Sequence, residues 1–192
     1  MINIHLPASE EEIRKLKVGD KVLLTGRIMT ARDAAHKYMV EKKPSYLREV
    51  LNGSVVYHCG PVVRKVKGKY EFVAAGPTTS IREEQYEGEV IAQYGVRGII
   101  GKGGMGPRTS EALQKYGAVY FSATGGLAAV LADAVKEVEN VYMLEEFGVP
   151  EAMWVLNVED FPVMVSMDSH GKSIHDEVLN KSRAAFEKLI SP

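Results

Sequence analysis

The sequence predicts an α/β fold whose first third is mainly β. Residues 54–75 hold two runs rich in valine and aromatic side chains, a composition typical of strands. From residue 76 onward, apolar runs of strand length alternate with helical patterns, which favours a parallel sheet with crossover helices. No repeat, low-complexity linker or change of composition divides the chain, so we expect a single domain over residues 1–192.

The first third begins with a helix signal. Ser9 and Glu12 have the spacing of a capping box and predict a short helix near 9–17. The other elements expected here are a strand over 21–30, a helix over 31–43, and strands over 54–60 and 62–75, the last one turning at Lys67-Gly68-Lys69.

The remaining two thirds alternate between helix and strand patterns. The expected order is a helix at about 80–93, a strand over 96–102, helix 107–117, strand 118–123, helix 125–138 and strand 141–147. One or two strands then follow over 154–168, where Pro162 interrupts the pattern. An amphipathic helix over 175–190 comes last, with apolar residues on or near one face: Ile174, Val178, Ala185 and Leu189.

Composition excludes several classes of function. The 192 residues are 45% hydrophobic and have a formal net charge of −1, so the basic excess of a general nucleic-acid or membrane-surface protein is missing. No apolar run approaches the roughly 18 residues of a spanning helix, and the acidic start is unlike a signal peptide. A single cysteine, Cys59, excludes an internal disulfide and a multi-thiolate metal site. We expect a cytoplasmic protein.

The stretch IIGKGGMGPRTSEAL, residues 99–113, matches the dinucleotide fingerprint at Gly101, Gly103 and Gly106. That fingerprint also needs an acidic residue at the end of the next strand, to bind the ribose. Here the strand ends at 122–124, Ser-Ala-Thr, without a carboxylate. A P-loop is absent as well, so nucleotide binding is disfavoured.

A tight strand-to-helix turn explains most of this stretch. Pro107 suits a first helical position, with Thr109 or Ser110 near the cap. Lys102 is not explained by the turn, because it places a hydrated cation at the carboxyl end of an apolar strand, where ligands bind in parallel sheets. Anion binding by Lys102, helped by the following helix N-terminus, stays open.

A second stretch, GPTTSIR at 76–82, also runs from an apolar strand into a helix. Its three hydroxyls, Thr78 to Ser80, exceed what one helix cap requires. Thr78 and Arg82 are four residues apart, so a helix beginning here presents both on one side. Arg82 is suited to binding a carboxylate, although an exposed pairing with Glu83 or Glu84 is the alternative.

A third stretch, TARDAAH at 30–36, places Arg32 and Asp33 after the strand over 21–30. Asp33 either caps the next helix or orients Arg32, and His36 could equally lie at the surface. Arg32, Arg82 and Lys102 thus follow three strand ends in a chain of almost zero net charge. Together these cations would suit a small substrate with two carboxylates.

Other residues favour structural interpretations. Gly125 and Gly126 open an alanine-rich helix, where close packing is favoured over a backbone anion site. Cys59 is best interpreted as a small buried hydrophobe. The spacing of Asp168, His170 and His175 is not diagnostic of a metal site. A polar turn before the last helix is the favoured interpretation.

The stretches at 30–36, 76–82 and 101–105, with SATGGLAAVLA at 122–132, together resemble one family. It is the β-type subunit, or carboxy-terminal domain, of iron–sulfur-dependent hydro-lyases, which comprises class I fumarases and L-tartrate dehydratases. The resemblance extends from about residue 10 to residue 190. It implies a swivelling β/β/α domain, with a parallel central sheet, a second smaller sheet and helices in three layers.

The resemblance also implies a reaction, the reversible hydration of fumarate to (S)-malate, with tartrate dehydration as the near alternative. A [4Fe–4S] cluster would be held by three cysteines of a separate α subunit, with no metal in this chain. Arg32, Arg82 and Lys102 would hold substrate carboxylates, and Thr78 would be the base that removes a proton. Glu83 departs from the apolar residue common at its position. A non-catalytic anion-binding or nucleotide-binding module is the alternative from another class.

Overall fold

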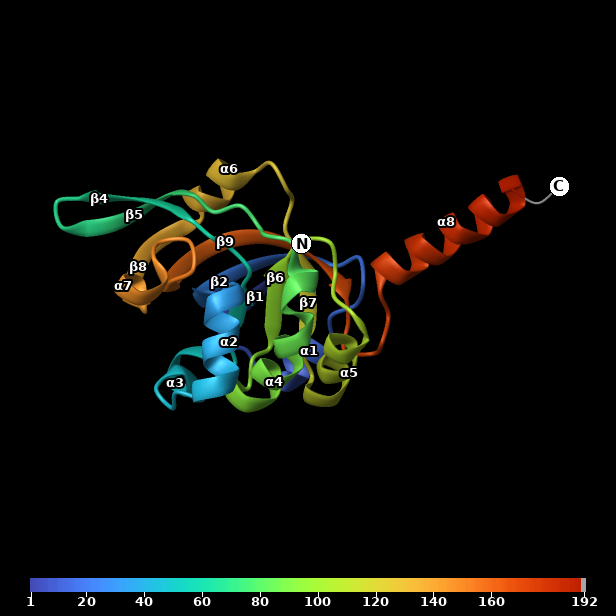
Figure 1. The fold of residues 1–192 in the computed structure, drawn as a ribbon, viewed down its shortest axis with the longest axis horizontal. Coiled ribbons are helices and arrows are strands. Elements are labelled where there is room, and N and C mark those ends of the chain that lie inside the picture. The colour runs from blue at the N-terminus through green and yellow to red at the C-terminus, as the bar shows by residue number, and fades with distance from the viewer. Residues whose placement is uncertain (191–192) are drawn as a thin grey trace.

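A computed structural model of the chain describes residues 1–190, which form one large mixed sheet, a separate hairpin and several helices (Figure 1). The seven strands of the large sheet run in the order β1-β2-β3-β6-β7-β9-β8. Their bounds are β1 (Ile2–Leu6), β2 (Lys21–Thr30), β3 (Val55–Tyr57), β6 (Gly98–Gly101), β7 (Val119–Ser122), β8 (Val135–Tyr142) and β9 (Met153–Met167).

The hairpin and the helices connect these strands. The hairpin consists of β4 (Val62–Val66) and β5 (Lys69–Ala74). The helices are α1 (Glu10–Arg14), α2 (Asp33–Lys42), α3 (Leu47–Leu51), the 3₁₀ turn η1 (Ser80–Glu83), α4 (Glu84–Tyr94), α5 (Pro107–Tyr116), α6 (Ala128–Asp133), α7 (Leu144–Phe147) and α8 (Ile174–Ile190). No helix among residues 1–190 is long and apolar enough to cross a membrane.

Strands β1, β2, β3, β6 and β7 are parallel to one another, and α4 and α5 make the crossovers between β3, β6 and β7. The predicted parallel sheet is therefore confirmed for this part of the chain. The 15-residue β9 runs antiparallel to β7, β8 and β2. Because β9 pairs with both β7 and β2, the strands β2, β3, β6, β7 and β9 form a closed ring of pairings.

Alternating side chains of the ring strands enter two apolar clusters. Ile100 and Phe121 enter a cluster that every strand of the ring shares. Their neighbours Ile99 and Tyr120 point the other way, into a cluster covered by α2, α3, α4 and α5. The helices thus cover one face of the parallel strands (Figure 1).

The hairpin is a two-stranded sheet, separate from the large one. Lys67 and Gly68 have φ values of 49° and 83°, so the turn lies where the sequence predicts it. Tyr70 and Phe72 meet the edge of Trp154, with ring centroids 5.0 and 5.8 Å away. The hairpin therefore closes one side of the ring-strand cluster.

The region 125–147 differs from the prediction. The expected helix over 125–138 is confined to α6, and Val135 begins a strand that pairs with β9. The expected strand over 141–147 is also wrong, because β8 ends at Tyr142 and α7 follows it. Pairing with β9 outweighs the helical spacing, because β-branched residues pack well on a pleated surface. Strand β1 was not expected either.

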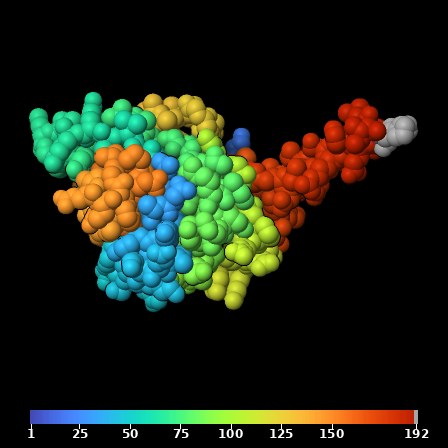
Figure 2. Space-filling model, viewed as in Figure 1, coloured from blue at the N-terminus to red at the C-terminus, as the bar shows by residue number. Residues whose placement is uncertain are grey.

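Helix α8 confirms the predicted final helix but not a packed role for its apolar face. Figures 1 and 2 show that α8 projects away from the rest of the chain. No described residue of α8 is buried, and Val178 and Leu189 are 61% and 84% exposed. Only the start of α8 lies against the rest of the described chain, where His175 contacts Ser166 and Val178 borders a hollow with Met105.

Candidate anion-binding site

The ends of three parallel strands place three functional segments at one edge of the sheet. Arg32 follows β2, His58 follows β3 and Lys102 follows β6. Since β2, β3 and β6 are neighbouring parallel strands, their carboxyl ends meet at the same edge. This is the edge where open α/β sheets bind ligands.

The segment 76–82 reaches this edge by a different route from the predicted one. It follows β5, which belongs to the hairpin and not to the large sheet. The Thr78 N–H donates to the His58 carbonyl at 2.7 Å, and the Lys102 N–H donates to the Thr78 carbonyl at 3.3 Å. The Ser80 N–H in turn donates to the Lys102 carbonyl at 3.1 Å. These bonds insert Thr78 and its neighbours between the extensions of β3 and β6.

Both arginines of the site approach one carboxylate. Arg82 Nη2 donates to Asp33 Oδ2 at 2.9 Å and to Thr78 Oγ1 at 3.2 Å. Arg32 Nη2 lies 3.9 Å from the same Asp33 oxygen and 3.2 Å from Glu151 Oε1. Asp33 therefore joins the two arginines.

The structure excludes two alternatives that the sequence left open. Asp33 does not cap α2, because the N-cap residue is Arg32 and the Ala34 N–H of the first turn donates to Glu151 Oε2 at 3.0 Å. Arg82 does not pair with Glu83 or Glu84, because Asp33 faces it from the other loop. The predicted approach of Thr78 and Arg82 is confirmed by their hydrogen bond.

Lys102 presents its side chain to solvent. Within residues 1–190, its ammonium group has neither a hydrogen-bond partner nor a salt-bridge partner. The side chains of Arg82 and Asp33 are also about half exposed, at 44% and 48%. The edge thus carries three cations, of which Lys102 is exposed and unpaired among these residues, together with Asp33 between the arginines and Glu151 beside Arg32.

The glycines of the 99–113 stretch have separate structural reasons. A Cβ at Gly101 would overlap Ser80 Oγ, and Gly103 has a φ of 87°. The first turn of α5 is already bound to a protein carboxylate: Glu84 accepts from the N–H groups of Gly106 and Arg108 at 2.7 and 2.9 Å. The anion position of a nucleotide-binding helix start is therefore filled by Glu84.

Glu84 also contacts a residue that the sequence predicts near the cap of α5. Gly106 is the N-cap and Pro107 lies in the first turn, as the turn interpretation expects. Thr109 lies in the same first turn, near the cap as predicted, and donates its hydroxyl to Glu84 Oε2 at 2.7 Å.

A fully buried polar cluster lies beneath the site. Glu87 Oε2 is 3.1 Å from His36 Nε2 and 2.8 Å from His58 Nε2. The other ring nitrogen of His58 is 2.9 Å from Ser80 Oγ, which is 2.8 Å from the Tyr120 hydroxyl. His36, for which a surface position was an open alternative, is 0% exposed.

Charges in this cluster are set by proximity and burial. Burial alone would lower the pKa of His36, but Glu87 and Glu83 outweigh it and raise this pKa to about 9. The two histidines overcome the burial of Glu87 and lower its pKa to about 2. Burial keeps the pKa of His58 below its ordinary value, against the opposing effect of Glu87. The favoured state at neutral pH is therefore an imidazolium at His36, a carboxylate at Glu87 and a neutral His58.

Glu83 is the neighbouring buried carboxyl. Its side chain is 0% exposed and neither oxygen has a hydrogen-bond partner, although Oε2 lies 3.7 Å from His36 Nδ1. Burial raises the pKa of Glu83 to about 7.

Several candidates of the sequence analysis have structural roles. Cys59 is buried, and burial raises the pKa of its thiol to about 12, as expected for a small core residue. Asp168 accepts from the N–H groups of His170 and Lys172 at 2.9 and 3.1 Å, which confirms the polar turn. His175 contacts Ser166 Oγ at 3.1 Å.

The close-packing interpretation of Gly125 and Gly126 was wrong. A Cβ at either position would meet nothing within 4 Å. Both precede α6 in a turn, where Gly126 has a φ of 85°. Its backbone conformation, and not close packing, therefore favours glycine at 126.

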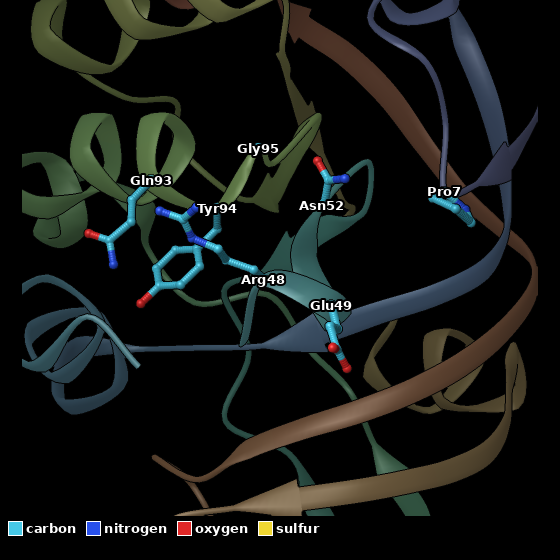
Figure 3. Close-up of a pocket in the computed structure, with 7 residues that line it drawn as sticks. All are labelled: Pro7, Arg48, Glu49, Asn52, Gln93, Tyr94 and Gly95. Atoms are coloured by element: carbon cyan, nitrogen blue, oxygen red, sulfur yellow. The ribbon is translucent and has the colours of Figure 1, made fainter. Parts of the chain in front are cut away.

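One surface hollow lies away from the site. Figure 3 shows its lining, which comes from the last part of α4, from α3 and from Pro7. Asn52 and Gly95 of this hollow precede β3 and β6, so it lies at the opposite edge of the sheet. It contains none of the site residues.

Sequence reasoning missed His58, Glu87 and Tyr120. His58 and Tyr120 stand in apolar stretches that give little sign of a polar cluster, VVYHCG and AVYFSA, whereas Glu87 is one of several glutamates in a charged stretch, REEQYEGE. Glu83 and Glu87 are one helical turn apart, which is the single local signal that two carboxylates share a helix face.

Comparison with known proteins agrees with these features. The sequence model of the family described as Fumarase C-terminus matches residues 1–178. A Geobacillus stearothermophilus protein provisionally named fumarate hydratase class I is 49% identical over 98% of this chain, which spans only 36% of that relative. The L(+)-tartrate dehydratase subunit beta of Escherichia coli K12 is 43% identical, over 88% of this chain and 83% of that relative.

A further relative has almost the length of this chain. A Methanocaldococcus jannaschii protein, provisionally named L(+)-tartrate dehydratase subunit beta, is 47% identical over 95% of both chains. The match to the family model covers the strand ends, the buried cluster and the glycine-rich loop alike. The chain therefore belongs to the Fumarase C-terminus family.

Proposed function

We propose that this chain is the β-type subunit of a two-subunit hydro-lyase that adds water reversibly to fumarate and forms (S)-malate. The observation that carries the proposal is the convergence of three cation-bearing segments at one sheet edge. Hydrogen bonds join Thr78 to His58 and Lys102, and Asp33 joins Arg32 to Arg82. A four-carbon dicarboxylate offers two anionic groups to such an edge.

The cations would have two tasks in this reaction. Arg82 and Arg32 carry planar guanidinium groups that suit bidentate binding of carboxylates. Lys102, exposed and without a partner among residues 1–190, is available to the second carboxylate. Removal of a proton beside a carboxylate places extra negative charge on that group, and fixed cations stabilise it.

Thr78 is the proposed base. A threonine hydroxyl is a weak base at its ordinary pKa and needs activation. The guanidinium of Arg82 donates to Thr78 Oγ1 at 3.2 Å, and a donor to this oxygen favours its deprotonated form. Arg82 would thus orient substrate and activate Thr78 at the same time.

The iron–sulfur cluster of the proposed enzyme does not fit this chain. Three cysteine ligands are needed, whereas the chain has one cysteine, Cys59, which is buried with its pKa raised. We propose that a partner α subunit holds the [4Fe–4S] cluster, as the word "beta" in the relatives' names suggests. The partner would complete the site by covering this edge of the sheet. We propose that the complex acts in the cytoplasm.

A second candidate substrate is L-tartrate. It is favoured by the relatives that this chain nearly spans, which are named as tartrate dehydratase β subunits. Tartrate has the same two terminal carboxylates, so the same cations would hold it.

The test is anaerobic co-expression of this chain with its candidate α subunit, cluster reconstitution, and parallel assays with fumarate and L-tartrate. We expect activity from the complex and none from either chain alone. Turnover by this chain alone, or no turnover of either substrate by a reconstituted complex, would contradict the proposal.

A further inference from the structure

The buried cluster beneath the site has a defined direction of hydrogen bonding. The Arg32 carbonyl lies 2.9 Å from His36 Nδ1 and can only accept, so this nitrogen carries a proton. With an imidazolium at His36, Nε2 also donates, and its acceptor is Glu87 Oε2. Through His36, Glu87 Oε2 is thereby connected to the Arg32 carbonyl in the 30–36 segment.

In the other half of the cluster, around His58, each hydrogen bond also has a defined donor and acceptor. His58 donates from Nε2 to Glu87 Oε2, which leaves Nδ1 as an acceptor. The Ser80 hydroxyl donates to that nitrogen and accepts from the Tyr120 hydroxyl. Every proton in this chain of bonds has one acceptor, so the arrangement is fully determined from Tyr120 to the Arg32 carbonyl.

The cluster contacts each segment of the candidate site. His36 binds the Arg32 backbone, Ser80 belongs to the 76–82 segment, and the Ser80 N–H binds the carbonyl of Lys102. The His58 carbonyl accepts from the Thr78 N–H at 2.7 Å. Displacement of either imidazole would therefore move backbone atoms that hold the proposed ligands of the substrate.

A metal ion explains the cluster less well. Among the described residues, His36, His58 and Glu87 are the one group of ligand types close enough to share an ion. Two ligands of a tetrahedral zinc lie roughly 3.4 Å apart. The contacts of 2.8 and 3.1 Å are hydrogen-bond lengths instead.

We infer that Glu87, acting through His36 and His58, is the positioning residue that fixes the three cation-bearing segments relative to one another. This inference rests on the proposed function for its catalytic consequence, whereas the positioning itself is a property of the chain. The charged groups that face His36 are Glu87 and Glu83, both from the η1–α4 segment, with Asp33 nearby and His58 on the other side.

Two substitutions of Glu87 separate the effect of its hydrogen bonds from the effect of its charge. In Glu87→Gln the amide oxygen can accept from Nε2–H of both His36 and His58, so it preserves the connections without the carboxylate charge. Glu87→Leu removes them. Glu83→Gln is the matched control, because Glu83 is equally buried, lies one turn earlier and makes no hydrogen bond.

The first measurement uses the full chain without substrate. Imidazole ¹⁵N spectra should show His58 as the neutral Nε2–H tautomer and His36 doubly protonated at pH 7. Hydrogen exchange should rise at least tenfold at 76–82 and 101–104 in Glu87→Leu. In Glu87→Gln and Glu83→Gln it should stay within about twofold.

Three results would overturn the inference. One is an equal rise in exchange at 135–142, which would indicate general destabilisation. The second is the opposite His58 tautomer. The third is a stoichiometric metal ion in the purified chain that is lost in Glu87→Leu.

The second measurement uses the complex with the α subunit. Glu87→Gln should keep kcat/KM within about threefold, and Glu87→Leu should lose at least tenfold, mainly through KM. Normal kinetics of Glu87→Leu would overturn the catalytic consequence. A wild-type complex inactive on fumarate and tartrate would refute the proposed function, while the exchange and tautomer results would still decide the positioning role.

Discussion

The side chains at the sheet edge differ in how much they contribute to stability. Arg82 and Lys102 contribute little to stability, because Arg82 has only exposed partners and Lys102 has none among residues 1–190. His36, Glu87 and Glu83 are fully buried and bear on stability directly. The residues that would contact a ligand thus lie exposed at the sheet edge. The residues that stabilise the fold are buried beneath them.

Replacement of the exposed cations should therefore affect activity alone. In the complex, Lys102→Ala and Arg82→Ala should each reduce kcat/KM by about 100-fold, since each removes a charge from the proposed dicarboxylate site. Their thermal midpoints should stay near that of wild type. Arg64→Ala, which removes an exposed hairpin arginine paired with Glu71, is the control with unchanged kinetics. Near-normal kinetics in both site variants would contradict the site assignment.

Glu83 should make stability depend on pH. Its pKa rises from 4.5 to about 7 on folding, so the folded chain binds more protons in that window. The contribution of Glu83 to stability is full below pH 4.5 and is lost as the pH rises through 7, at about 1.4 kcal/mol per unit of pKa difference. Urea unfolding of wild type and Glu83→Gln from pH 5 to 8 measures this. Parallel curves for the two proteins would show that Glu83 does not titrate in this way.

At the scale of elements, α4 and α5 are joined by a side chain at a helix start. Glu84 accepts from the N–H groups of Gly106, Arg108 and Thr109 and from the Thr109 hydroxyl. It thereby provides the capping that the Gly106 N-cap lacks.

Glu84→Ala should lower the free energy of unfolding by about 1–2 kcal/mol, because it leaves the first turn of α5 without its acceptor. Equilibrium denaturation in urea measures the loss. Glu89→Ala is the matched control, an exposed glutamate of the same helix without a partner among residues 1–190, and it should change stability by less than about 0.5 kcal/mol. Equal effects of the two substitutions would exclude a capping role.

At the scale of the whole molecule, β9 joins the parts of the fold. It pairs with β2, β7 and β8, and its Trp154 is fully buried against the hairpin. Because β2, β7, β8 and the hairpin all contact β9, loss of any one of them would destabilise the others.

We expect a single cooperative transition for the chain. Trp154 is its only tryptophan, so fluorescence reports on the hairpin and β9, whereas far-UV circular dichroism reports on all helices and strands. The two urea transitions should coincide. A fluorescence change that precedes the loss of circular dichroism would show that the hairpin and β9 open independently.

Local sequence signals were sufficient where one element determines the outcome. The capping box at Ser9, the hairpin turn at Lys67–Gly68 and the parallel strands with their crossover helices are all confirmed. They failed at 125–147, where pairing of β8 with β9 depends on residues far away in the chain.

By itself, the sequence determined the α/β class, most elements and the identity of the cations Arg32, Arg82 and Lys102, because these depend on local patterns of residue type. Only the tertiary structure decided that Asp33 joins the arginines, that Glu84 fills the helix start of the glycine-rich loop, and that Glu87 ties two histidines beneath the site. Hydrogen bonds of this kind join residues 22 to 51 positions apart, and a linear pattern contains no record of such distances.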